Sequence, residues 1–225
     1  TYFCIFLYIF VFLMFTPQSK SWCQQVEFDA FWRQHGDFDC PCEASPATPL
    51  WYQSKIILSL FQLCNGNVEK TKLQKLLFLY SQRKQEAEYD FVPYKFGCYS
   101  YSANADLVTM VKKEYLSESE KGYKKIDLKD YLPTLKPKDR VLLTETVESY
   151  GNMTNETLIK HTYINFPYYA INSTIAERIL NKEYYNRVLK TIPNNSKKSI
   201  FTIGYEGISL ENYLNKLVKN NIKLL

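Results

Sequence analysis

The chain has 225 residues, of which 46% are hydrophobic and 23% are charged, and its net charge at pH 7 is +5. This composition excludes an intrinsically disordered chain, and the length suffices for one large domain or two small ones. The charge is uneven, because residues 1–50 contain two basic and five acidic residues and residues 51–225 therefore carry a net +8. A basic globular part is compatible with an anionic partner such as nucleic acid, although moderately basic proteins without one are common.

Residues 1–50 differ in composition from the rest of the chain. Tyr2–Phe15 are 14 uninterrupted apolar residues, fewer than the about 20 that a helix needs to span a bilayer and nearer to the core of a signal peptide. We expect residues 1–50 to be either an apolar leader and linker or an extension foreign to the natural protein. We predict a cytoplasmic protein, with membrane association or secretion as the alternative if Tyr2–Phe15 are native. Four Asn-x-Ser/Thr sequons would fit a secreted glycoprotein: Asn152, Asn155, Asn172 and Asn194.

The six cysteines do not form one metal or disulfide scheme. A metal set could be drawn from Cys23, His35, Cys40 and Cys42. A single residue separates the last two, however, whereas zinc knuckles place two residues between paired cysteines. Cys64 lies on an apolar helical face, which is typical of a buried and inert thiol. His161 has no acid or nucleophile at a spacing that would recruit it, so we predict no metal site, no cofactor and no catalytic residue.

From Tyr52 onward, apolar residues recur at helical spacing. The pattern predicts helices over about 52–63, 71–82 and 103–116, with Thr71 and Ser102 as N-caps of the second and third. In the third helix, the residues expected to face inward are Leu107, Val108, Val111 and Leu116. "SESEKGYKKIDL" (117–128) then predicts a β-hairpin with a Gly-containing turn. The predicted fold is therefore mainly α with a small β-hairpin, a winged-helix-like domain over residues 52–130.

In a winged helix, the last helix lies in the DNA major groove and the hairpin touches phosphates. The candidate nucleic-acid-binding residues are Asn104, Thr109, Lys112 and Lys113 on that helix and Lys121, Lys124 and Lys125 on the hairpin. Lysines at such positions are suited to phosphate contact, but they are equally typical of a solvated face. Winged helices also serve as protein–protein modules. The sequence therefore leaves DNA and a protein partner open.

Two segments of this region resemble known families. "TKLQKLLFLYSQ" (71–82) followed by "YDFVPYKFGCYSYSANADLVTMVKKEYL" (89–116) resembles the N-terminal region of bacterial and archaeal proteins that carry a C-terminal domain of the family called domain of unknown function 488. The same stretch is more distantly similar to the Panacea antitoxin domain, whose members share a KLQKLL-type helix and a Tyr-Gly-Pro turn. The corresponding turn here is Phe96-Gly97-Cys98 and lacks the proline. The second resemblance implies a role in neutralising a toxin or regulating a defence locus, with a component of that locus as partner.

Residues 131–190 continue in helical segments and are expected to pack as a helical extension on the winged-helix-like domain. Thr154 is the predicted N-cap of one of these helices, although no acid or Gln completes a capping box. A Pro-interrupted aromatic stretch follows, in which Tyr163, Phe166, Tyr168 and Tyr169 could stack bases; we expect packing in the core or an interface. Thr191–Ser199 reads as a polar linker.

The segment 199–225 predicts an incomplete β-α-β unit. Ile200–Ile203 is strand-like, Ser209 could cap a helix, and Ile222–Leu225 begins a second apolar run. Thr202-Ile203-Gly204-Tyr205 resembles the opening turn of the domain of unknown function 488, which implies a truncated start of that α/β domain, ending before the family's Asp-Val-Arg motif. The resemblance would place Tyr205 and Glu206 near a ligand turn, because ligands gather at the carboxyl ends of strands in such sheets.

The sequence as a whole predicts a regulatory or binding protein whose winged-helix-like domain contacts nucleic acid or a protein partner. The alternative is a fragment of an enzyme acting on a nucleotide or nucleic acid, with its catalytic α/β domain missing.

Overall fold

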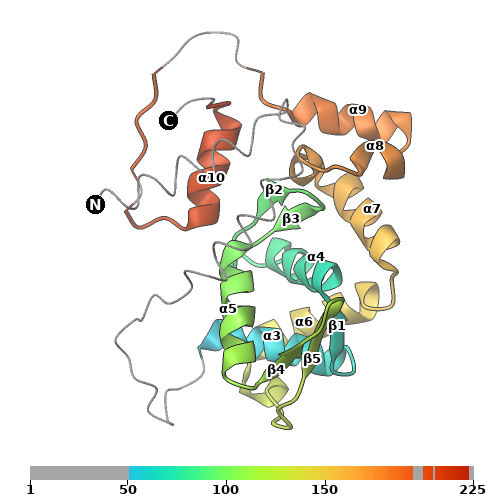
Figure 1. The fold of residues 1–225 in the computed structure, drawn as a ribbon, viewed down its shortest axis with the longest axis vertical. Coiled ribbons are helices and arrows are strands. Elements are labelled where there is room, and N and C mark those ends of the chain that lie inside the picture. Colours follow the sequence, from blue (N-terminus) through green and yellow to red (C-terminus); the bar gives the residue numbers. More distant parts are fainter. Residues whose placement is uncertain (1–50, 195–199, 205, 223–225) are drawn as a thin grey trace. The chain divides into compact units, whose positions relative to one another are not determined.

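The computed structural model describes residues 51–194, 200–204 and 206–222, which lie in the compact unit Leu50–Asn221 apart from Ile222. Its helices are α3 (Tyr52–Leu63), α4 (Lys70–Gln82), α5 (Tyr101–Lys112), α6 (Pro137–Tyr150), α7 (Asn155–Asn165), α8 (Ala176–Ile179), α9 (Lys182–Thr191) and α10 (Leu210–Lys219), with 3-10 turns η1 (Leu132–Thr134) and η2 (Pro167–Ala170) (Figure 1). Its strands are β1 (Asn67–Glu69), β2 (Val92–Tyr94), β3 (Gly97–Tyr99), β4 (Leu116–Glu118) and β5 (Gly122–Lys125). The predicted mainly α fold with a small hairpin is confirmed.

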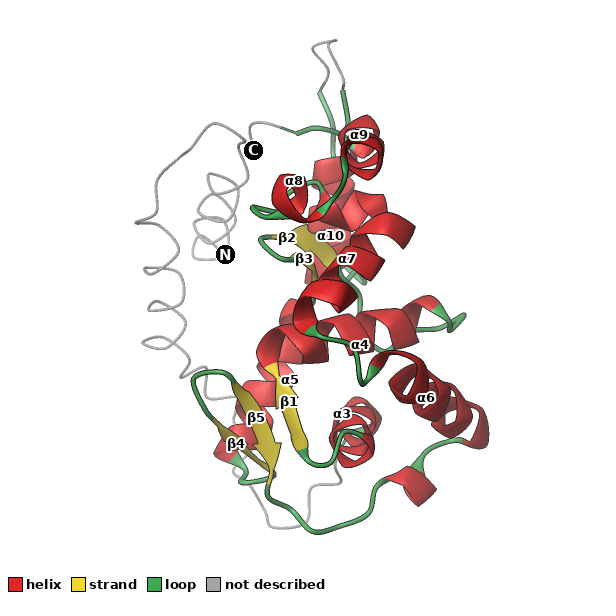
Figure 2. Cartoon of the chain, turned by 90° about the vertical axis from the view of Figure 1, so that its right-hand side faces the viewer, coloured by secondary structure: helices red, strands yellow, loops and turns green. Residues whose placement is uncertain are grey.

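The first part of the unit has a winged-helix arrangement. Strands β4 and β5 form the predicted antiparallel hairpin, and β1 adds to it on the β5 side, giving the strand order β1-β5-β4 (Figure 2). Val68 of β1 pairs with Tyr123 of β5. Strands β2 and β3 form a separate two-stranded sheet between α4 and α5. The order along the chain is therefore α3-β1-α4-α5-β4-β5, with one small hairpin inserted before α5.

Helix α4 lies at the centre of the unit. It is buried almost all round, with Leu73, Leu76, Leu77 and Phe78 fully buried. This burial arises because α4 contacts α6 and α7 of the helical extension as well as β1, β3 and β5. A helix that is buried on all faces has neighbours on all sides, and α4 thereby ties the extension to the winged-helix part.

Two predicted helix starts are wrong. Helix α5 begins after Ser100, whose hydroxyl accepts a hydrogen bond from the Ala103 amide at 3.2 Å, so Ser100 and not Ser102 is the N-cap. Helix α4 begins after Glu69, and Thr71 lies inside its first turn. In both cases the strand that precedes the helix fixes where the helix starts, and the local pattern of polar residues does not show that boundary.

The end of the third predicted helix also differs from the structure. Val108 is 44% exposed instead of facing inward. Leu116 is buried as predicted, but it belongs to strand β4. Glu114 adopts a φ of +60° between the two elements, so the chain turns there and leaves the helix.

The aromatic stretch after α7 is part of the core. The ring of Phe78 makes edge-to-face contacts with Phe166 and Tyr169, with centroid distances of 5.0 and 4.6 Å. Tyr163 is buried, and its hydroxyl lies 2.7 Å from that of Ser173. These rings are engaged in packing, as expected, and Thr154 caps α7 as predicted through the Thr157 amide.

The C-terminal segment contains one of the predicted elements. Ser209 caps α10 through the Asn212 amide, as expected. The predicted strand at Ile200–Ile203 is wrong, because the described residues 200–204 adopt no regular structure and Ile200 is 98% exposed. A strand requires a pairing partner, and the short apolar run shows only the propensity. Residues 223–225, the end of the second apolar run, lie outside the described residues.

Candidate nucleic-acid interface

Helix α5 exposes the residues that the sequence assigns to DNA contact. Thr109, Lys112 and Lys113 are exposed, and Asn104 is half-buried. Thr109 follows Ser102 by seven residues, so both lie on one line along the helix, and the two lysines continue it by one more turn. The Thr109 hydroxyl donates to the Ala105 carbonyl at 3.0 Å, so it can offer only acceptor capacity to a ligand.

The β4–β5 hairpin contributes two of its three predicted lysines to the exposed surface. Lys121 and Lys124 are exposed, whereas Lys125 is half-buried. The Lys125 amine donates to the carbonyls of Asp127 and Lys129 and lies 5.4 Å from the centre of the Tyr131 ring. Lys125 is thus engaged in holding the chain that follows the hairpin.

Acidic residues are interleaved with these lysines. Glu114, Glu118 and Glu120 are exposed between α5 and the hairpin turn. Glu118 forms an ion pair with Lys70 at 2.6 Å, with both side chains 43% exposed. The positive charge of this face is therefore local to the two helix lysines and the hairpin tip, and it does not extend over the whole face.

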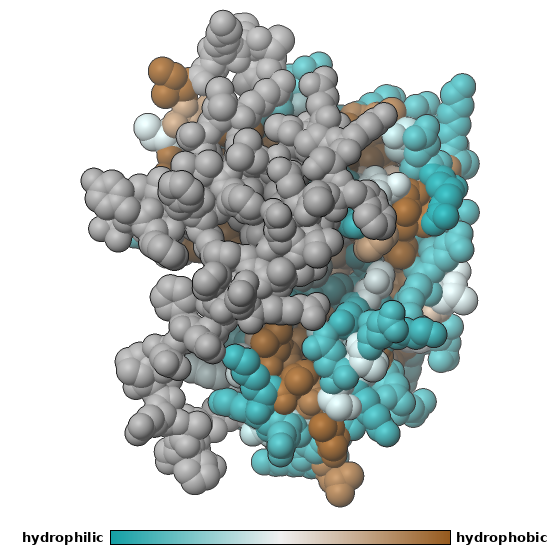
Figure 3. All heavy atoms as spheres, viewed as in Figure 1, coloured by the Kyte–Doolittle hydropathy of each residue, from teal (hydrophilic) through white to brown (hydrophobic). Residues whose placement is uncertain are grey.

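An apolar strip crosses the same region. Figure 3 shows hydrophobic surface over α5 and the β4–β5 hairpin, with hydrophilic residues on both sides. The exposed apolar residues of these segments are Val108 on α5 and Ile126 and Leu128 after β5, of which Leu128 is 99% exposed. This strip is a feature that the sequence reading missed, because Val108 fits the inward-facing pattern of its helix.

Helix α4 binds the backbone that leads into α5. The Gln74 side chain accepts from the Ser100 amide at 2.9 Å and donates to the Ser100 carbonyl at 3.3 Å. The Lys75 amine, 2% exposed, donates to the Cys98 carbonyl at 2.8 Å. Burial lowers the pKa of the Lys75 amine and raises the pKa of the Cys98 thiol. The KLQKLL helix and the Phe-Gly-Cys turn, far apart in sequence, are thus in direct contact.

Helix α10 contacts the same end of α5. The Glu211 carboxylate is fully buried and accepts hydrogen bonds from the Ser100 hydroxyl at 3.1 Å and from the Ser102 amide at 2.7 Å. The Ser102 hydroxyl lies 2.9 and 3.0 Å from its two oxygens. Ser102, which does not cap α5, therefore serves as a partner of α10. The sequence reading missed Glu211, because more than 100 residues separate it from its partners.

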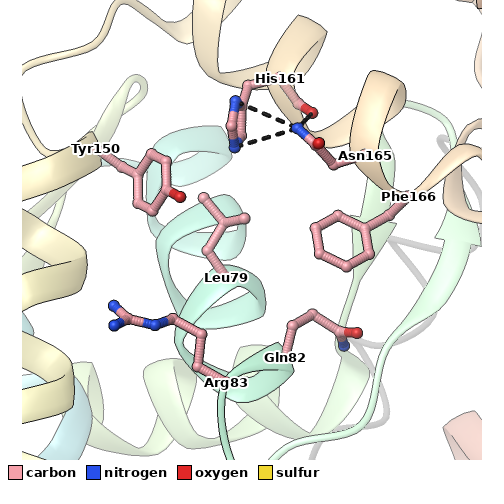
Figure 4. A pocket seen from close by; sticks show the side chains of 7 residues that line it. All are labelled: Leu79, Gln82, Arg83, Tyr150, His161, Asn165 and Phe166. Atoms are coloured by element: carbon pink, nitrogen blue, oxygen red, sulfur yellow. Dashed lines mark hydrogen bonds between the residues drawn. The ribbon is translucent and has the colours of Figure 1, made fainter.

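A hollow of about 260 Å³ lies between α4, α6 and α7. Figure 4 shows the residues that line it: Leu79, Gln82, Arg83, Tyr150, His161, Asn165 and Phe166. The His161 ring lies 5.0 Å from that of Tyr150, and burial lowers the pKa of its imidazole. Arg83 is paired with Glu145 at 2.5 Å. This lining contains no carboxylate, thiol or aliphatic hydroxyl for His161 to activate, and its contacts are those of a packed histidine.

The predicted ligand turn at Tyr205 and Glu206 lies only partly in the described residues, and the cysteines and histidine considered for a metal set lie outside them. Glu206 is exposed on a turn, and Tyr205 lies outside the described residues, as do Cys23, His35, Cys40 and Cys42. The described residues include no group of three His, Cys, Asp or Glu side chains that could hold a metal ion. Within the same residues, every helix is too short or too polar to cross a membrane.

Comparison with known proteins gives no assignment. No protein-family model matches the chain. A search of curated proteins finds no significant match.

Proposed function

We propose that the winged-helix part of this chain binds nucleic acid, with α5 as the reading helix and the β4–β5 hairpin as the wing. The observation that carries the proposal is the joint exposure of cationic and polar side chains on α5 and on the hairpin that α5 contacts. These side chains are Thr109, Lys112, Lys113, Lys121 and Lys124.

The chemistry of these groups assigns them different roles. Lysine ammonium groups bind phosphate oxygens and position a protein on a duplex, whereas an Asn amide can pair with adenine in the major groove. Lys112, Lys113, Lys121 and Lys124 are therefore phosphate contacts, and Asn104 is the candidate for base contact. If each lysine neutralises one phosphate, the logarithm of the binding constant should fall with the logarithm of the salt concentration with a slope of about −3.6.

The test is the salt-dependent binding of the full chain to a labelled DNA duplex, followed by fluorescence anisotropy. We expect the double variant Lys112→Glu, Lys113→Glu to bind at least about tenfold more weakly and with a shallower salt slope. The matched control is Lys160→Glu with Lys182→Glu, which reverses two exposed lysines on α7 and α9. If the anisotropy of the labelled DNA does not rise when the wild-type chain is added at low salt, nucleic-acid binding is refuted.

A second candidate function is the binding of a protein partner by the same face. The exposed apolar side chains of this region, which include Val108, Ile126 and Leu128, favour it (Figure 3), because exposed apolar patches with a polar rim mark protein interaction sites. The resemblance to the Panacea antitoxin domain makes a toxin or another component of a defence locus the candidate partner. Val108→Asn should weaken this association while leaving DNA affinity within about twofold, since neither side chain carries a charge that acts on a phosphate.

The segments 71–82 and 89–116, which together carry the family resemblance, are in contact through Gln74 with Ser100 and Lys75 with Cys98. These contacts support treating the two segments as one unit. The proposed regulatory role in a defence locus depends on that resemblance, and its test is whether the chain reduces the toxicity of a co-expressed neighbouring gene product.

A further inference from the structure

Helix α10 is attached to the N-terminal end of α5 by a buried carboxylate. Glu211 is 0% exposed and accepts hydrogen bonds from the Ser100 hydroxyl, the Ser102 amide and the Ser102 hydroxyl. A carboxylate near the start of a helix is favoured by the helix dipole and by the unpaired amides there. Glu211 therefore forms a specific contact across more than 100 residues of sequence.

Two further groups of hydrogen bonds hold α10 in this place. The Asn215 amide donates to the Phe91 carbonyl at 2.7 Å and accepts from the Tyr168 hydroxyl at 2.9 Å. The Asp90 carboxylate accepts from Ser209 and Asn212, each at 2.7 Å. Helix α10 contacts both β2 and α5 (Figure 1). Much of this attachment consists of polar contacts, which water can replace when the helix opens.

The attached end is the end of α5 that a reading helix uses. In helix-turn-helix proteins, the N-terminal residues of the recognition helix contact the base edges. Ser102 lies on the same line of α5 as Thr109, about 10 Å away along the helix axis. Ser102 stays exposed beside docked α10, and the Glu211 carboxylate lies 2.9 Å from its hydroxyl. The negative charge of docked α10 is therefore held at the start of this line, where it opposes the approach of DNA phosphates.

We propose that α10 is an intramolecular inhibitor of nucleic-acid binding, and that its release from α5 raises the affinity of the winged-helix part for DNA. This inference rests on the proposed function of α5. The inhibited state is the docked state of the structure, and the active state has α10 detached while the core around α4 stays folded.

The experiment compares full-length variants that weaken the attachment at different points. Glu211→Gln puts an amide in place of the carboxylate and removes its charge, and Asn215→Ala removes two hydrogen bonds while keeping the Glu211 charge. Glu183→Gln is the matched control, because it removes one exposed carboxylate from the first turn of α9. Hydrogen exchange of the α10 amides reports release, and anisotropy with a labelled DNA duplex reports affinity.

We expect Glu211→Gln and Asn215→Ala to speed exchange in α10 and to bind DNA at least about fivefold more tightly, the lower end of typical couplings between sites. Glu183→Gln should change neither quantity. If one of the two variants fails to fold, the other still decides the question, because each detaches α10 by a different contact.

Three results would overturn the inference. Released α10 with unchanged DNA affinity would refute inhibition, and the proposed function would still stand if Lys112→Glu with Lys113→Glu abolished binding. If α10 is released in both variants but only Glu211→Gln binds DNA more tightly, the gain in affinity comes from the lost charge of Glu211 and not from the release of α10. DNA binding by neither the wild type nor a released variant would refute the proposed function itself, and the inference with it.

Discussion

The turn that leads into α5 makes a sharp prediction at Gly97. Its φ is +90°, and a Cβ atom added there would lie 2.5 Å from Cε1 of Tyr163. An L-residue in this backbone region costs about 1–2 kcal/mol. Forcing extra atoms into a packed core costs about 1–3 kcal/mol more. We therefore expect Gly97→Ala to lower the free energy of unfolding by about 2–5 kcal/mol.

The chain supplies a control that separates the two causes. Gly66 has a similar φ of +81°, and no atom of the described structure lies within 4 Å of a Cβ added there. Gly66→Ala should therefore show the backbone cost alone, about 1–2 kcal/mol. The assay is urea unfolding of both variants, followed by circular dichroism. The difference between their free energies of unfolding measures the clash with Tyr163.

A double-mutant cycle tests the partner of that clash. Tyr163→Leu removes Cε1, so Gly97→Ala should cost about 1–3 kcal/mol less in the Tyr163→Leu background than in the wild type. The reasoning is refuted if Gly97→Ala is no more destabilising than Gly66→Ala. It is refuted equally if the changes in the free energy of unfolding caused by Gly97→Ala and Tyr163→Leu simply add in the double variant.

Other predictions concern a cap and the response to pH. Thr154→Ala should lower the free energy of unfolding by about 1 kcal/mol, because the hydroxyl caps α7, and a variant as stable as the wild type would contradict this. Burial and the hydrogen bond to Asp139 raise the pKa of Tyr52 to about 12. The stability that Tyr52 contributes below pH about 10 should therefore be lost as the pH rises toward 12. In Tyr52→Phe, the urea midpoint should fall less steeply with pH over this range. Burial would raise the pKa of Asp139, but hydrogen bonds from Tyr52 and Lys84 hold it below its usual value. Stability should therefore fall as pH drops below about 4, and this fall should be smaller in Asp139→Asn.

Elements defined by local patterns could be predicted from the sequence. Helices α3 and α4 follow apolar residues at helical spacing, and the hairpin follows a polar turn in which the Ser119 amide donates to the Gly122 carbonyl at 2.8 Å. Strand β1 could not be predicted, because it has three residues and a single buried side chain, Val68. Its pairing with β5 is set by tertiary structure, more than 50 residues further along the chain.

The candidate site was predictable in composition but not in detail. Exposed lysines on α5 and the hairpin follow from the fold class, whereas the inward bond of Lys125 to the Asp127 and Lys129 carbonyls depends on how the chain leaves the hairpin. Glu211 could not be predicted as buried, because an acid in an amphipathic helix normally faces water. Its burial requires the donors of Ser100 and Ser102, which only the folded chain brings to it.

Ser100 joins three elements that the sequence keeps apart. Its amide donates to Gln74 of α4, its hydroxyl lies 3.1 Å from the carboxylate of Glu211 in α10, and its hydroxyl also caps α5 by accepting from Ala103. Detachment of α10 therefore removes a hydrogen bond at the start of α5, while Gln74 and Lys75 keep that start bound to the core. The C-terminal end of α5 and the hairpin lysines have no comparable attachment to α10 among the described contacts. Docking of α10 is thus expected to act on the end of α5 that we propose to read bases and to leave the end that we propose to bind phosphates unchanged.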